Sequence, residues 1–121
     1  MNNNAYIGLA LSDGSVSYIA VQYDGIFEMA GMKLKNFYKS KKRVKALFAL
    51  GSLRTLGSMP YGGWNPESPS YDKVHCCAFI RDLGCKPKTH TAQKVQSKEA
   101  FFLLGGWTYL FENGGWTLGY K

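Results

Sequence analysis

The chain has 121 residues, a size typical of one domain, so we expect a single hydrophobic core over residues 1–121 rather than two lobes around a cleft. Hydrophobic residues make up 45% and charged residues 19%, which excludes an intrinsically disordered chain. The formal net charge is +7, and the sequence contains neither an apolar run of about 20 residues nor a signal peptide. We therefore expect a cytoplasmic protein without membrane association.

The first predicted element is a β-hairpin. Residues 6–11 and 15–23 are rich in strand-forming residues, and Asp13-Gly14 between them supplies the positive φ angles of a tight turn. Apolar side chains occupy both alternating sets of the second strand. We therefore expect both faces of this strand to be covered, one by a helix and the other by a partner or a loop.

A helical region is predicted for residues 28–50. Apolar side chains there recur on one helical stripe while lysines occupy the other side, the stripe comprising Leu34, Phe37, Tyr38, Val44, Leu47 and Phe48. Ser40 divides the region, because serine is a favoured N-cap and residues 41–50 continue as a second helix. Gly51 is the expected stop.

The excess positive charge belongs to this helical region. Seven of the fifteen basic residues lie in segment 33–45, which has no acid, whereas the remaining chain holds equal numbers of acids and bases. One interpretation is a solvated helix face. The other is a surface that binds phosphate or an acidic partner, and its candidate residues are Lys39, Lys41, Lys42, Arg43 and Lys45.

Residues 52–72 are predicted to form a long loop, which is commonly functional in a compact domain. Tyr61 and Trp64 flank Gly62-Gly63 within it. Two interpretations follow, a lid whose aromatic rings stack on a planar ligand or a plug at the edge of the core.

Three more strands are predicted after the loop. One spans residues 73–81, and the other two, residues 107–111 and 116–120, form a hairpin around Asn113-Gly114. Between them, residues 98–104 are predicted to form a short helix or strand. The sum is an α+β fold in which an antiparallel sheet of about five strands carries one or two helices on one face.

The cysteines and histidines do not form a recognisable catalytic or metal site. Cys76, Cys77 and Cys85 lack the spacing of zinc ligands, and an odd number of cysteines does not make a disulfide framework. Adjacent cysteines of a strand face opposite ways, so we expect one in the core and one outside. His75 and Cys77 share a face, but no third group is evident to orient the histidine. We expect no enzymatic activity, metal or cofactor.

A ligand-binding site requires fewer specific residues than a catalytic site, and the sequence contains both phosphate donors and aromatic rings for one. The guanidinium groups of Arg54 and Arg81 can donate to phosphate oxygens, although Arg81 beside Asp82 is equally consistent with a structural ion pair. Planar rings on which a base can stack are supplied by Tyr23, Phe27, Tyr61 and Trp64.

The C-terminal segment concentrates apolar side chains that one helix layer cannot cover. We expect them to drive formation of a homo-oligomer, by default a two-fold dimer. The residues concerned are Phe101, Phe102, Leu103, Leu104, Trp107 and Trp116.

Several segments together resemble small phage and prophage accessory proteins. They are Val-Gln-Tyr-Asp-Gly at 21–25, Leu-Lys-Asn-Phe-Tyr at 34–38, the stretch 43–57, Ile-Arg-Asp at 80–82 and the aromatic run 109–116. The chain departs from that pattern at Ile26-Phe27, where Tyr-Pro is usual, and at Leu83, where a second arginine is usual. Some features are also similar to viral sponges of the Thoeris anti-defence type.

This resemblance implies a phage counter-defence protein in the host cytoplasm during infection. It would sequester a nucleotide-derived immune signal, such as a cyclic nucleotide or a cyclic ADP-ribose-like molecule. The alternative is a protein-directed inhibitor of a host defence complex, of the anti-CRISPR type, acting through the basic helix. Lysines and aromatic rings that converge on one cavity favour the first interpretation, and a separate exposed lysine stripe favours the second.

Overall fold

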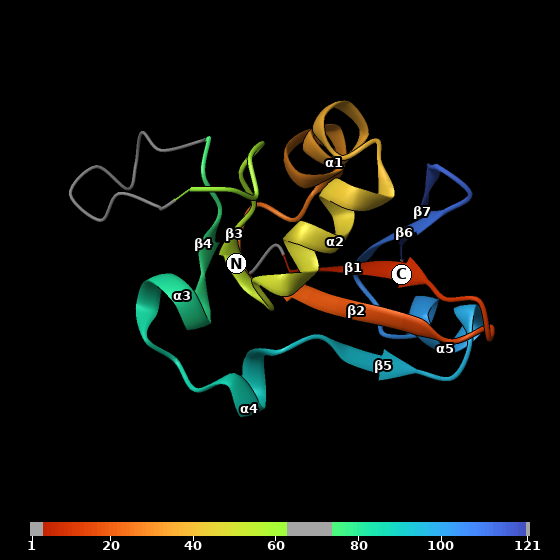
Figure 1. Ribbon diagram of the computed structural model, residues 1–121. Helices are drawn as coiled ribbons and strands as arrows, with labels where there is room; N and C mark the ends of the chain where they lie inside the picture. The colour runs from red at the N-terminus through yellow and green to blue at the C-terminus, as the bar shows by residue number, and fades with distance from the viewer. Residues whose placement is uncertain (1–3, 63–73, 121) are drawn as a thin grey trace.

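The computed structural model describes residues 4–62 and 74–120. A mixed β-sheet lies between helices in this part of the chain (Figure 1). The strands are β1 (Ala5–Ala10), β2 (Val16–Val21), β3 (Leu53–Thr55), β4 (Cys77–Ala78), β5 (Gln93–Val95), β6 (Trp107–Glu112) and β7 (Gly115–Tyr120). The helices are the π-helix η1 (Phe27–Gly31) and α1 (Met32–Phe37), α2 (Lys41–Ala49), α3 (Phe79–Leu83), α4 (Pro87–His90) and α5 (Lys98–Phe102).

The sheet is larger than expected and is not purely antiparallel. Its order is β4-β3-β2-β1-β6-β7, and β5 pairs with β2 beside β3. The α+β class is confirmed. The prediction of an antiparallel sheet of about five strands is wrong, because β1 pairs parallel with β6 and β2 pairs parallel with β3. A parallel pair needs a crossover connection, and the helices of residues 27–49 supply one between β2 and β3.

Both predicted hairpins are confirmed. β1 pairs antiparallel with β2 across the turn at Asp13-Gly14, and β6 pairs antiparallel with β7 across Asn113-Gly114. Asn113 has φ 53° and Gly114 has φ 78°, the two positive values of a type I′ turn. The two-residue turn fixes the register of β7, with Glu112 opposite Gly115.

One face of the sheet is buried beneath α1 and α2. Leu34, Tyr38, Val44 and Leu47 are fully buried, as the apolar stripe predicts. Phe37 is an exception with 48% exposure, because the chain leaves the helix at Tyr38 and Tyr38 fills the core position instead. Ser40 is confirmed as the N-cap of α2, since its hydroxyl accepts a hydrogen bond from the amide of Arg43 at 3.2 Å.

The opposite face of the sheet carries a second core under α5. The prediction that helices pack on one face only is therefore wrong. Phe101 is fully buried there with Val16 and Leu110. A Cβ at Gly8 would lie 2.8 Å from the Phe101 ring, so only glycine lets this ring approach β1. Phe101 is therefore a core residue of the monomer and does not contribute to a self-association surface. Both faces of β2 are covered, as expected, but the second face packs against the helix α5 and not against a partner or a loop.

The single strand predicted for residues 73–81 is wrong. Pairing with β3 is limited to Cys77 and Ala78, and the chain then turns into α3. The Asp82 carboxylate accepts a hydrogen bond of 2.8 Å from the Ala78 amide and so stabilises the start of this helix. Cys76 and Cys77 are both buried, so the prediction that one of them faces outward is also wrong. No helix among the described residues is long and apolar enough to cross a lipid bilayer.

Candidate functional site

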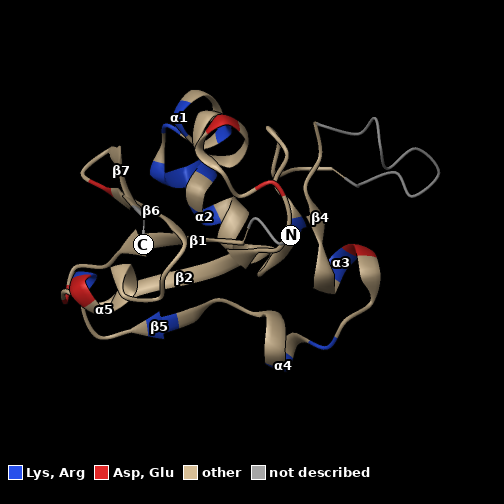
Figure 2. Ribbon diagram, turned by 180° about the vertical axis from the view of Figure 1, so that it is seen from behind, with Lys and Arg blue, Asp and Glu red and all other residues tan. Residues whose placement is uncertain are grey.

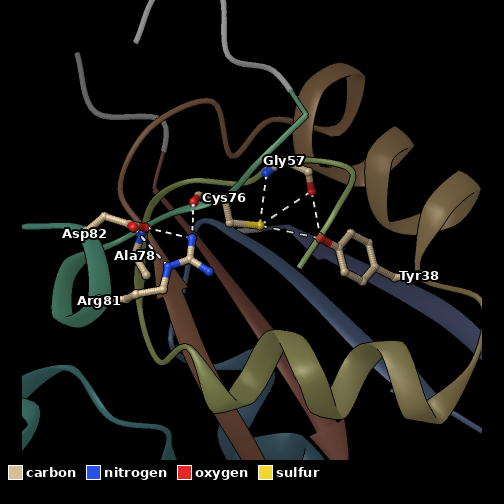
Figure 3. Close-up of polar contacts among 6 residues, drawn as sticks. All are labelled: Tyr38, Gly57, Cys76, Ala78, Arg81 and Asp82. Carbon is tan, nitrogen blue, oxygen red and sulfur yellow. Dashed lines mark hydrogen bonds and ion pairs between the residues drawn. The ribbon is translucent and has the colours of Figure 1, made fainter. Parts of the chain in front are cut away.

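Arg81 is engaged by groups of its own chain. Its guanidinium donates to both carboxylate oxygens of Asp82, at 2.9 Å and 2.8 Å, and to the carbonyl of Cys76 at 2.9 Å (Figure 3). Two parallel bonds to one carboxylate are the strong geometry of an arginine pair. These contacts favour the structural interpretation of Arg81, which ties α3 to the segment before β4. Its contact with a ligand stays a prediction.

Tyr38 and Cys76 form a buried polar junction next to this pair. The Tyr38 hydroxyl donates to the Gly57 carbonyl at 2.8 Å, and the Cys76 sulfur accepts from the Gly57 amide at 3.2 Å (Figure 3). Gly57 has no room for a side chain, because a Cβ would lie 2.4 Å from the His75 carbonyl carbon. Burial raises the pKa of both Tyr38 and Cys76. A buried protonated thiol is a poor nucleophile, so the junction joins elements of the fold rather than carrying chemistry.

We expect Tyr38→Phe to lower the free energy of unfolding by about 1–2 kcal/mol at pH 7, because it removes a buried hydrogen bond and leaves the Gly57 carbonyl without its best donor. The raised folded-state pKa of Tyr38 also makes stability fall as pH rises above about 10, where the unfolded chain loses the phenolic proton. Urea unfolding at pH 7 and at alkaline pH measures both effects. A variant whose stability falls as steeply with alkaline pH as the parent's would contradict this role of Tyr38.

The other predicted ligand residues are dispersed. Arg54 lies over the Tyr23 ring, 5.8 Å from its centroid, and both side chains are exposed. The positive charges of Arg54 and Arg81 both act to lower the pKa of the Cys77 thiol, although burial raises it overall. Tyr61 is 47% exposed, and Trp64 lies outside the described residues. The two arginines therefore occupy the β3–β4 end of the sheet, away from the aromatic cavity that Phe27 lines.

That cavity lies between the η1–α1 helices and the β6–β7 hairpin, and we call it the hairpin groove. Its volume is about 480 Å³. Aromatic and aliphatic side chains form its walls and two lysines belong to its lining, the residues being Phe27, Lys35, Lys39, Tyr109, Trp116 and Leu118. It thus combines one residue predicted to stack on a ligand, Phe27, with one predicted for the basic surface, Lys39.

Hydrogen bonds outside the cavity hold the walls of the hairpin groove in place. The Trp116 indole donates to the Tyr38 carbonyl at 2.9 Å, and the Tyr109 hydroxyl donates to the Gly25 carbonyl at 2.7 Å. Gly31 allows close packing, because a Cβ there would lie 2.5 Å from the Phe27 ring and 3.1 Å from the Tyr109 ring. The aromatic surfaces are fixed before any ligand arrives, which lowers the entropic cost of binding.

The charged residues that line the hairpin groove are both lysines. Lys35 and Lys39 are exposed, and no aspartate or glutamate is among the lining residues. Glu28 is the acidic residue whose charge acts on Tyr109, and its effect adds to burial in raising the pKa of that phenol. An apolar aromatic wall bordered by two ammonium groups suits a ligand that is planar at one end and anionic at the other.

The basic segment divides between three environments. Lys35 and Lys39 belong to the hairpin groove, whereas Lys41, Lys42 and Lys45 belong to α2 and are exposed. Figure 2 shows the blue of Lys and Arg on the α1 and α2 ribbons. Arg43 turns inward: it donates to the Ser58 carbonyl at 2.9 Å and lies 5.6 Å from the centre of the Tyr38 ring. Of the five predicted partner-binding residues, three therefore form an exposed stripe on α2.

Sequence reasoning did not assign Lys35, Tyr109, Trp116 or Leu118 to a binding site. The sequence shows that aromatic residues are concentrated in the C-terminal hairpin, but it does not show that this hairpin lies beneath α1. The register of β6 with β1 and the crossover through α1 bring the hairpin and α1 together. No local sequence pattern predicts this contact.

No protein-family model matches this sequence, and neither a curated protein nor a solved structure matches it. The resemblance to phage accessory proteins therefore stays a prediction. Within residues 4–62 and 74–120, no three His, Cys, Asp or Glu side chains are grouped so that they could hold a metal ion.

Proposed function

We propose that this protein is a non-enzymatic binding protein that takes up a nucleotide-derived signal in the hairpin groove. One observation carries the proposal: aromatic side chains and two lysines converge on a single cavity whose lining residues include no carboxylate. The resemblance to small phage proteins supports a role in counter-defence, in which the protein sequesters the signal in the host cytoplasm. The likeness to anti-defence sponges points the same way.

The size and chemistry of the groove suit such a ligand. A volume of about 480 Å³ lies within the range of small-molecule sites, about 300–1,000 Å³. Stacking of a base on an aromatic side chain is worth about 1–3 kcal/mol. Lys35 and Lys39 belong to the lining, and their ammonium groups would donate to phosphate oxygens in charge-assisted bonds of about 1.5–3 kcal/mol each. Phe27 keeps its predicted stacking role, and the lysines take the role first assigned to Arg54 and Arg81.

A second candidate function rests on the exposed α2 stripe. Lys41, Lys42 and Lys45 all face solvent, and no described carboxylate forms an ion pair with them. A stripe of three ammonium groups suits an acidic surface of a host defence protein, as the anti-CRISPR type of inhibitor requires. Here affinity would depend strongly on salt and not on the aromatic groove.

Two matched charge-reversal variants separate the candidates. Lys35→Glu with Lys39→Glu alters the hairpin groove, and Lys41→Glu with Lys45→Glu makes the same charge change on α2. We expect the groove variant to bind cyclic ADP-ribose and cyclic dinucleotides at least 100-fold more weakly than the parent, as measured by calorimetry, because two charge-assisted bonds are lost. The α2 variant should bind them nearly as the parent does.

Protein purified from infected cells gives a second readout, since heat denaturation releases a captured small molecule for mass spectrometry. If no nucleotide is released, no probe binds, and only the α2 variant loses protection in an infection assay, the groove proposal is wrong and the inhibitor function is supported. Loss in the groove variant alone supports sequestration.

A further inference from the structure

Strand β7 ends the sheet with an open edge. In the described residues it pairs with β6 alone, and β6 pairs on its other side with β1. The type I′ turn makes Glu112 and Gly115 a hydrogen-bonded pair, so Gly115, Thr117 and Gly119 bond to β6. The amides and carbonyls of the alternate residues, Trp116, Leu118 and Tyr120, therefore point away from the sheet. They form a row of donors and acceptors that a further strand can pair with.

This edge lacks the features that normally prevent strand addition. Residues Gly115–Tyr120 include no charged residue and no proline, in a chain whose net charge is +7. The neighbouring acid, Glu112, is neutralised by Lys98 at 3.0 Å. Natural edge strands are usually protected by lysine, proline or a bulge. The β7 edge is thus open both electrostatically and sterically.

Apolar side chains lie on both sides of the strand. Leu118, on the groove side, is 45% exposed. On the opposite side the Phe102 ring lies against Gly119, where a Cβ would be 2.5 Å from it. An apolar border above and below an open edge provides surface that pairing with another strand would bury.

We propose that β7 pairs antiparallel with β7 of a second copy, which extends the sheet through a two-fold dimer. A strand edge with alternating donors and acceptors is complementary to itself in this orientation. Charge selects a second copy over an acidic partner, because a surface for an acidic protein would carry cations and residues Gly115–Tyr120 include none. Lys35 and Lys39, which line the groove together with Leu118, are exposed to solvent, where salt screens their repulsion. Both hairpin grooves then open on the same side of the joined sheet.

Amide hydrogen exchange measured over a dilution series tests the pairing without any substitution. We expect the amides of Trp116, Leu118 and Tyr120 to exchange at least tenfold more slowly in a concentrated sample than in a dilute one. Thr117 and Gly119, bonded to β6 in the monomer, should be protected at both concentrations. Equal exchange of the three outward amides across the series would overturn the proposal.

Mass measurements with a matched pair of variants provide the second test. Light scattering should give about twice the 13.5 kDa of one chain for the parent at high concentration. Leu118→Lys, which places a charge at the edge, should give a monomer with an unchanged circular dichroism spectrum. Leu83→Lys makes the same change at an exposed leucine of α3 and should stay dimeric. A parent that is monomeric at every concentration, or a folded Leu118→Lys protein that stays dimeric, rejects the pairing whether or not the groove binds a nucleotide.

Discussion

Replacing Phe101 by alanine is expected to lower the free energy of unfolding by about 3–5 kcal/mol. The ring is fully buried between α5 and the sheet, against Gly8 and Val16, and 6.3 Å from the Tyr18 ring between centroids. Its removal leaves a cavity that the sheet cannot close, because β1 and β2 are each paired on both sides. Urea unfolding followed by circular dichroism measures the loss.

Leu83→Ala is the control for this experiment, since Leu83 is 38% exposed on α3 and its truncation should change stability by less than about 0.5 kcal/mol. A small loss for Phe101→Ala, similar to that of the control, would mean that α5 does not cover the sheet. The second core would then be absent, and the residues around Phe101 would again be candidates for a self-association surface.

Leu47→Ala should destabilise the protein by about 2–5 kcal/mol, which is a large share of the 5–15 kcal/mol typical of a whole domain. Leu47 is fully buried where α2 packs on the main core with Ile7, Ile19 and Leu34. The Leu47 side chain is enclosed by helix and sheet, so neighbouring atoms can fill little of the cavity that its truncation leaves. Thermal and urea unfolding are the appropriate measurements.

Phe37→Ala is the informative partner to this variant. Phe37 belongs to the same apolar stripe in the sequence, yet it is 48% exposed in the structure. We expect its truncation to change stability by less than about 1 kcal/mol. Equal losses for Leu47→Ala and Phe37→Ala would contradict the break between α1 and α2 at Tyr38 and Ser40.

The two cores have different consequences for function. The main core holds α1 over the C-terminal hairpin, and Tyr38 contributes to it through the bond from the Trp116 indole to its carbonyl. A variant that loosens α1 should therefore weaken ligand binding as well as stability. Phe101→Ala acts on the opposite face, so its effect on the hairpin groove should be confined to the loss of folded protein.

Local signals in the sequence determined the two hairpins and the start of α2. Asp13-Gly14 and Asn113-Gly114 specify tight turns through the backbone conformations that glycine and asparagine tolerate, and both turns are present. Ser40 marked the start of α2 because a hydroxyl can satisfy a free helix amide. The burial of Leu34, Val44 and Leu47 followed from their helical spacing. Each of these features depends on residues a few positions apart.

Tertiary structure alone decided the strand order and the location of the groove. The parallel pairing of β1 with β6 joins segments about a hundred residues apart, and no local pattern encodes which strands meet. The same pairing brings Tyr109 and Trp116 beneath Phe27 and Lys39, so the chemistry of the groove was visible as separate residue types but not as a site. Arg43 and Arg81 show the converse. Their charge is evident in the sequence, and so is the adjacent Asp82 as an ion-pair partner for Arg81. Only the fold reveals that the carbonyls of Ser58 and Cys76 also accept hydrogen bonds from the two guanidinium groups, because chain folding positions those acceptors.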